Sequence, residues 1–167
     1  MTKILQIGTK GQLGWELLRT CAPLGEVMAL DYPTVDLSNS AGLRELVRST
    51  NPDIIINAAA YTNVDKAESE PELARAINAT GPGILAEEAK KINAVLVHYS
   101  TDYVFDGTKD SPYVETDTPN PLSVYGQTKL EGEQAVMASG CSFLVLRSSW
   151  IYSRRSGFVA KVLEWAR

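Results

Sequence analysis

Three glycines directly after the first apolar segment constrain the fold of this chain more than any other feature. Residues 3–7 predict a strand, Gly8, Gly11 and Gly14 follow at intervals of three, and residues 15–21 have the apolar spacing of a helix. In such a strand–turn–helix unit, glycines let a pyrophosphate approach the backbone and let the helix pack closely on the strand. The helix start also offers free N–H groups and a positive dipole end to phosphates. The spacing is G-x-x-G-x-x-G rather than G-x-G-x-x-G, and a β–α turn that binds nothing is the alternative.

Strand-like and helical segments alternate along the rest of the chain. Further strands are predicted at 27–30, 52–57, 95–99 and 143–146, and helices at 41–49, 73–92, 124–138 and 158–167. Ser38 or Asn39 would cap the first of these helices and Ser123 the third, while the Gly81-Pro82-Gly83 run predicts a kink or break in the second. Continuous apolar strands between helices predict an α/β fold: a doubly wound parallel (Rossmann) sheet within one domain over residues 1–167.

Composition and charge narrow the classes of function. The chain has 167 residues, 44% of them apolar, which is enough for one domain with a core. A net charge of −4 without a basic block argues against nucleic acid as a partner. No apolar run has the length of a signal peptide core or a membrane span, so we expect a cytoplasmic protein without membrane contact. Cys21 and Cys141 lie far apart without metal-ligand spacing and are expected to be reduced.

Polar and small residues follow the carboxyl ends of the predicted strands, where ligands bind in parallel sheets. Asp31 comes after the second strand, about 20 residues beyond the glycine loop, where a carboxylate would bond the adenosine ribose and favour NAD(H) over NADP(H). The bland alternative is a solvated turn carboxylate. Two further groups complete the set. Asp36 and Leu37 would face the adenine or form a turn. After the third strand, a flat surface, an aromatic wall and a hydroxyl would come from Ala60, Tyr61 and Thr62.

A second polar group follows the fourth strand. Thr101 ends this segment, and Tyr125 and Lys129 are four residues apart, so they share one face of the predicted helix. A lysine ammonium favours the phenolate of a tyrosine, whose ordinary pKa is about 10. Tyr125 could then protonate a carbonyl oxygen as hydride arrives, with Thr101 polarising that carbonyl and Lys129 bonding the nicotinamide ribose. The alternative is an exposed aromatic and a solvated lysine. The lone His98, inside an apolar strand, is interpreted as structural.

These motifs together resemble the extended short-chain dehydrogenase/reductases. Within them, segments 11–16, 57–72, 98–107 and 147–152 resemble the dTDP-4-dehydrorhamnose reductase family. The resemblance implies reduction of the 4-keto group of dTDP-4-dehydro-L-rhamnose to dTDP-L-rhamnose by NADH or NADPH, a step of dTDP-rhamnose and cell-surface polysaccharide biosynthesis. Members of the family continue into a smaller C-terminal substrate region, so we expect this chain to be the cofactor-binding part with the substrate region missing.

The resemblance also implies roles for single residues. Tyr125 would be the proton donor, Lys129 its partner and Thr101 the hydroxyl that tunes it. Some members form homodimers with Mg²⁺ between carboxylates; Glu16 matches one ligand, and the others would lie beyond residue 167. The implied cofactor contacts are Gly8, Gly11, Gln12 and Leu13 at the pyrophosphate, Asp31, Asp36 and Leu37 at the adenosine, and Ala60, Tyr61, Thr62, Tyr99, Tyr125 and Lys129 beyond it; Thr101, Asp102 and Trp150 would contact the dTDP-sugar.

Two other functions stay open on sequence grounds. One is a sugar-nucleotide epimerase or dehydratase of the same superfamily; dehydration is disfavoured because Tyr103 stands where a glutamate would be expected. The other is a non-catalytic regulatory subunit on this fold, similar to the beta subunit of methionine adenosyltransferase. The complete Thr101, Tyr125 and Lys129 set favours an enzyme.

Overall fold

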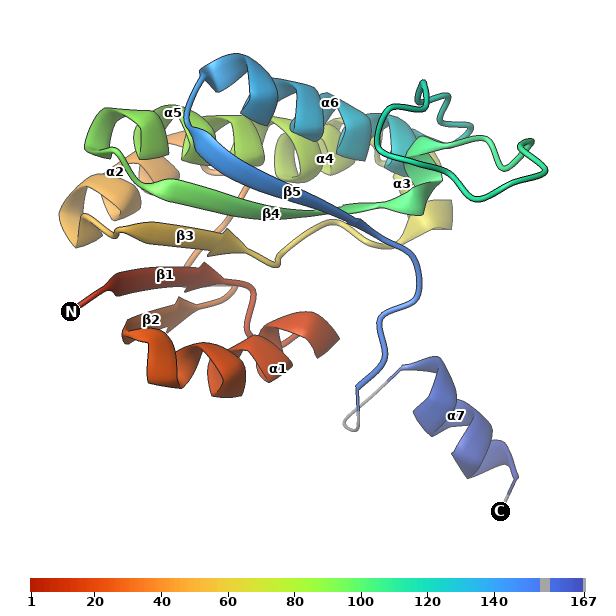
Figure 1. Ribbon diagram of the computed structural model, residues 1–167, viewed down its shortest axis with the longest axis horizontal. Helices are drawn as coiled ribbons and strands as arrows, with labels where there is room; N and C mark the ends of the chain where they lie inside the picture. The colour runs from red at the N-terminus through yellow and green to blue at the C-terminus, as the bar shows by residue number, and fades with distance from the viewer. Residues whose placement is uncertain (154–156, 167) are drawn as a thin grey trace.

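The computed structural model describes residues 1–153 and 157–166. Its centre is a parallel sheet of five strands in the order β2-β1-β3-β4-β5 (Figure 1). The strands are β1 (Lys3–Ile7), β2 (Glu26–Leu30), β3 (Ile54–Asn57), β4 (Val95–Thr101) and β5 (Ser142–Ser148). The chain runs outward from β1 to β2 and then returns past β1 to β3, so the strand order reverses between β1 and β3. This confirms the predicted doubly wound arrangement, in which ligands bind at that reversal.

Helices cover both faces of the sheet (Figure 1). On one face lies α1, while α2, α4, α5 and α6 lie on the other, and α7 stands apart from the sheet in this view. The bounds are α1 (Gln12–Cys21), α2 (Ser40–Thr50), α3 (Val64–Ser69), α4 (Pro71–Arg75), α5 (Gly81–Ile92), α6 (Val124–Ser139) and α7 (Phe158–Trp165), with short turns η1 (Ala22–Leu24), η2 (Ala76–Thr80) and η3 (Asp102–Val104). Within the described residues, none of these helices has the length and apolar character needed to span a bilayer.

The core has two layers because successive strand residues point to opposite faces. The larger cluster fills the space between the sheet and the α2–α5 side and includes Leu5, Leu43, Ile55, Leu85 and Leu96. A smaller cluster of Ile4, Cys21 and Ile56 lies on the α1 face. Cys21 and Cys141 are both buried and free, as predicted. The sheet is therefore anchored on both faces, and its carboxyl edge is the surface left for function.

Some predicted elements differ in their limits. The predicted helix 73–92 is interrupted before Gly81: a π-helical turn, η2, separates α4 from α5, which begins at Gly81. Pro82 has no N–H to donate, and the wider turn accommodates the missing bond. Residues 64–69, for which no element is predicted above, form α3, whose N-cap Asn63 accepts a bond from the Lys66 N–H. The last helix ends at Trp165, and its predicted end at Arg167 lies outside the described residues.

Candidate functional site

A cavity of about 330 Å³ opens at the carboxyl ends of β1, β2 and β3, where the strand order reverses. It brings together most of the residues predicted for the adenosine end of a dinucleotide. Those lining it are Gly8, Gly11, Asp31, Asp36, Leu37, Ala60 and Thr62. Lys10, Tyr32, Val35 and Ile77 also line it, and sequence reasoning did not find them.

The glycine loop has two structural positions and one open position. Gly8 has φ of +89°, and a Cβ there would lie 2.6 Å from the Ala59 nitrogen. A Cβ on Gly14 would lie 1.6 Å from the Gly8 carbonyl oxygen, so these two glycines let α1 and the loop after β3 close on the end of β1. Gly11 has no atom within 4 Å of such a Cβ and is the N-cap of α1 without a capping side chain. The first turn of α1 thus has no capping side chain, and its N–H groups suit an anionic group.

Asp31 holds the glycine loop against β2. Its carboxylate accepts hydrogen bonds from the backbone N–H groups of Thr9 at 2.5 Å, Lys10 at 2.7 Å and Tyr32 at 2.7 Å. Burial raises the pKa of Asp31, but these N–H groups outweigh it and the net pKa is lowered. The Lys10 ammonium donates to the Tyr32 carbonyl and also lowers this pKa through its charge. Asp31 therefore stays ionised with a lysine beside it, at the rim where an adenosine ribose would lie.

A second group of side chains gathers at the end of β4. Tyr125 lies in the first turn of α6, which Ser123 caps by accepting a bond from the Gly126 N–H at 3.1 Å, as predicted. Burial raises the pKa of Tyr125, the neighbouring Thr101 hydroxyl lowers it, and the net pKa is raised. The ring of Tyr103 meets that of Tyr125 edge-on, with centroids 5.5 Å apart. The predicted lowering of this pKa is thus absent, because burial of the phenol dominates.

Lys129 is almost completely buried one helical turn after Tyr125. Its Nζ donates to the Tyr99 carbonyl oxygen at 2.6 Å, which places the ammonium against the carboxyl end of β4. Burial lowers the pKa of Lys129 to about 8, and the charge of Glu133 opposes this lowering. The Lys129 ammonium therefore loses its proton more readily than that of an exposed lysine. The sequence pattern of Tyr125 and Lys129 predicted their shared helix face but not this burial.

Two buried residues that sequence reasoning missed hold the elements of the site together. Asn78, buried in η2, accepts a bond from the Tyr61 N–H at 2.9 Å and donates to the Tyr61 carbonyl at 3.1 Å and to the Thr128 hydroxyl at 3.2 Å. It thereby ties the loop after β3 to α6. Glu133 is buried one turn beyond Lys129, and its spacing of four residues from Lys129 was the available signal. Asn78 lies in the π-helical turn η2, and such turns are common near functional sites.

Other predicted site residues lie elsewhere or make other contacts. The Tyr61 hydroxyl donates to Glu70 at 2.7 Å and is not part of the cavity wall. The Gln12 amide donates to the Ile151 carbonyl and so joins α1 to the segment after β5. Trp150 is exposed, with its ring 5.4 Å from that of Phe158. Leu13 is half-buried in the first turn of α1 and Asp102 is exposed in η3, and neither lines the cavity.

The metal prediction stays a prediction, whereas the structure fits the histidine prediction. Glu16 pairs with Arg19 at 3.2 Å, and in the described part of the chain no three metal-ligating side chains come together. His98 is fully buried, with its Nδ1 3.2 Å from the Asn57 amide nitrogen, and burial lowers its pKa well below its ordinary value. A neutral structural histidine, as predicted, fits this environment.

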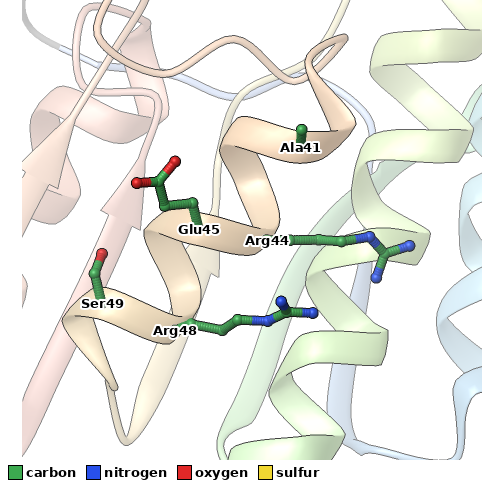
Figure 2. A pocket seen from close by; sticks show the side chains of 5 residues that line it. All are labelled: Ala41, Arg44, Glu45, Arg48 and Ser49. Carbon is green, nitrogen blue, oxygen red and sulfur yellow. The ribbon is translucent and has the colours of Figure 1, made fainter.

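A second hollow lies on the outer side of α2, lined by Ala41, Arg44, Glu45, Arg48 and Ser49 (Figure 2). The guanidinium groups of Arg44 and Arg48 reach across toward α5 in this view. There they bind the buried carboxylate of Glu88, at 2.9 Å and 2.6 Å. Because these cations are already paired, and no strand ends beside them, this hollow is not a candidate site.

The fold and the site define a Rossmann-type protein similar to short-chain dehydrogenase/reductases. The features that it shares with them are the doubly wound parallel sheet, the glycine-lined cavity at the reversal of strand order, and the Thr–Tyr–Lys group at the end of β4. The sequence model described as "RmlD substrate binding domain" matches residues 1–167. The chain belongs to this family, that of the dTDP-4-dehydrorhamnose reductases.

Individual relatives agree with this assignment. The dTDP-4-dehydrorhamnose reductase of Escherichia coli K12 is 50% identical over 164 residues, covering 96% of this chain and 55% of the relative. A crystal structure of a dTDP-4-dehydrorhamnose reductase from Clostridium acetobutylicum matches with a TM-score of 0.94 and 39% identity, over 98% of this chain and 59% of that one. One from Bacillus anthracis, in complex with NADP, matches with a TM-score of 0.92 and 35% identity, with the same coverage. The chain thus spans a little over half the length of these relatives.

Proposed function

We propose that the chain is the cofactor-binding part of a dTDP-4-dehydrorhamnose reductase. The protein containing it would reduce the 4-keto group of dTDP-4-dehydro-L-rhamnose to dTDP-L-rhamnose with hydride from NADPH or NADH. The observation that carries this proposal is the place of Tyr125 on α6, one turn before a buried Lys129 whose ammonium bonds β4, the strand that ends at Thr101, in a chain of this family. A regulatory subunit that only binds nucleotide has no need of this set.

The cavity fits the proposed cofactor. The open space at Gly11 and the uncapped start of α1 would receive the pyrophosphate, and Asp31 would face the adenosine ribose. Asp31 is already bonded by three backbone N–H groups, and the Lys10 ammonium is next to it. An extra phosphate on the ribose would therefore meet a cation as well as a carboxylate. We infer that the chain accepts NADPH, the phosphorylated form of the cofactor that a solved relative binds, as well as NADH.

The bound cofactor would supply the hydride, and the protein's own residues would handle the proton. The raised pKa of Tyr125 keeps its phenol protonated at neutral pH, as a proton donor to a carbonyl oxygen must be. The Thr101 hydroxyl, which lies beside this phenol, would hold the substrate carbonyl next to it. The Lys129 ammonium, on the same face of α6, would stabilise the phenolate left after transfer. Asp102 and Trp150, at the same edge of the sheet, would contact the sugar nucleotide.

A chimera tests the proposal directly. This chain replaces the matching 164 residues of the Escherichia coli relative, and NADPH or NADH oxidation is followed with dTDP-4-dehydro-L-rhamnose. We expect oxidation matched by dTDP-L-rhamnose formation, and its loss in a Tyr125→Phe variant that still binds NADPH. A folded chimera that binds NADPH but oxidises neither cofactor would refute the reductase function and favour the regulatory subunit.

A further inference from the structure

One face of α6 contacts the end of β4 over three successive turns. Tyr125, Lys129 and Glu133 are spaced by four residues, and their partners are consecutive residues of the strand. Tyr125 lies near Thr101, whose hydroxyl lowers its pKa, and Lys129 donates to the Tyr99 carbonyl. One turn beyond Lys129, the Glu133 carboxylate accepts a hydrogen bond from the Ser100 hydroxyl. Lys129 and Glu133 of α6 thus hold the strand end that carries Thr101.

Glu133 is charged and nearly inaccessible to water. It is 1% exposed, and Lys129 is 2% exposed. A buried carboxylate is costly unless it is paired, and here the partner comes from β5. The Arg147 guanidinium donates to the two carboxylate oxygens at 2.6 Å and 3.0 Å, and this pairing raises the pKa of Arg147. The guanidinium also lies over the ring of Phe105, 5.0 Å from its centroid.

Glu133 also affects the protonation of Lys129, as the charged and titratable groups around this lysine show. On its own helix Lys129 has Tyr125 and Glu133, and on β4 it faces His98, which burial keeps neutral. Glu133 is therefore the negative charge that favours the ammonium form of Lys129, against the desolvation that disfavours it. Without this charge, more Lys129 would be neutral near pH 7, and a neutral amine stabilises a phenolate less.

We propose that Glu133 is a positioning residue of the proton-transfer site, which fixes the end of β4 through Ser100 and supplies the negative charge opposite the Lys129 ammonium. Arg147 closes the arrangement by pairing with the far side of the same carboxylate. The link to catalysis rests on the proposed function, whereas the charge relation between Glu133 and Lys129 exists in the chain without substrate.

The test is an NMR titration of the Lys129 side chain in the chain as it stands, labelled at lysine and assigned with a Lys129→Met variant. The wild-type midpoint is expected near pH 8. In Glu133→Gln we expect it to fall by about one unit or more, because the opposing charge is gone and Arg147 is unpaired. Glu131→Gln is the matched control: Glu131 lies on the same helix but pairs with Arg75 at 2.8 Å, and its removal should leave the midpoint unchanged.

A double variant, Glu133→Gln with Arg147→Gln, guards against misfolding caused by an unpaired arginine. Its Lys129 midpoint should also lie below that of the wild type. An unchanged midpoint in the folded double variant would overturn the proposal and leave Glu133 as a structural partner of Arg147. Because neither substrate nor cofactor is present, this outcome does not depend on turnover. In an active chimera, Glu133→Gln should lower kcat more than it raises the KM for NADPH, and Glu131→Gln should do neither.

Discussion

Replacing Gly14 by alanine should destabilise the whole chain, whereas the same replacement at Gly11 should leave stability intact and weaken cofactor binding. At Gly14 the new Cβ would lie 1.6 Å from the Gly8 carbonyl oxygen, and real Cβ contacts stay above 3.0 Å, so α1 must retreat by about 1.4 Å. The retreat strains the buried bond from the Gln6 amide to the Gly14 carbonyl, now 2.7 Å. Overpacking costs about 1–3 kcal/mol, and an unmade buried hydrogen bond costs a similar amount.

Gly11 is the matched control for this loop. Its φ of −69° suits alanine, and the added methyl group meets no atom within 4 Å. We expect a stability change below about 0.5 kcal/mol, because a lower unfolded-state entropy offsets a slightly poorer N-cap. The methyl group would occupy the space proposed to receive the pyrophosphate. We expect at least a tenfold rise in the Kd for NADPH, about 1.4 kcal/mol.

Urea unfolding followed by circular dichroism measures the stabilities, and NADPH fluorescence measures the binding. A loss of about 3 kcal/mol in Gly14→Ala would appear as a Tm lowered by about 6–12 °C. The reasoning is refuted if Gly14→Ala unfolds at the wild-type urea concentration. It is equally refuted if folded Gly11→Ala binds NADPH as tightly as the wild type, since the phosphates would then not lie on this loop.

Three further predictions follow from other contacts. Glu88→Gln should destabilise the chain by about 1–2 kcal/mol in urea at pH 7, since it weakens the bonds to Arg48 and its neighbours. Hydrogen bonding to Arg48 and other cations lowers the pKa of Glu88 from 4.5 to about 2, so the stabilisation by its carboxylate is complete above pH 4.5. The difference between variant and wild type in the free energy of unfolding should therefore narrow as the pH falls from 4.5 toward 2. Lys10→Gln should raise the Kd for NADPH several-fold more than that for NADH, and equal changes in titrations with the two cofactors would contradict the proposed 2′-phosphate contact. Asn78→Ala should cost about 2–4 kcal/mol in urea unfolding and raise amide exchange at Tyr61, because three hydrogen bonds between η2, the loop after β3 and α6 are lost; unchanged exchange would show that the loop is held by other contacts.

Local patterns predicted the elements well. Apolar runs located all five strands, and short polar signals located the N-caps Asn39 and Ser123. The strand limits moved by one or two residues because pairing with neighbours, rather than propensity, decides where a ladder ends. β4 and β5 extend to Thr101 and Ser148, which pair with each other although both lie beyond their apolar runs. Helix α3 was missed because its residues are mostly polar, and only its N-cap Asn63 signals it.

The candidate site divides in the same way. The glycine loop, Asp31 and Ala60 could be assigned to one cavity because parallel strands bring their carboxyl ends to one edge. The predicted lowering of the Tyr125 pKa was wrong, because burial of the phenol raises this pKa, and burial depends on how α6 packs and not on helix spacing. Lys10 and Asn78 gave no recognisable motif, because each acts through partners distant in sequence. Glu133 shares the four-residue spacing of Tyr125 and Lys129, but its bonds to Ser100 and Arg147 could not be read from that spacing. The roles of Tyr125, Lys129 and Thr101 in catalysis stay predictions.

The sequence by itself determined the class of fold, the glycine loop and the helix face shared by Tyr125 and Lys129, because these depend on residue spacing within one segment. Only the tertiary structure decided that Asp31 is bonded to the loop beside Lys10, that Lys129 is buried against the Tyr99 carbonyl, and that Glu133 and Arg147 lie behind it. The physical reason is that desolvation and charge pairing arise when separate segments meet. Those two effects set the pKa of Lys129, and with it the chemistry available at the end of β4.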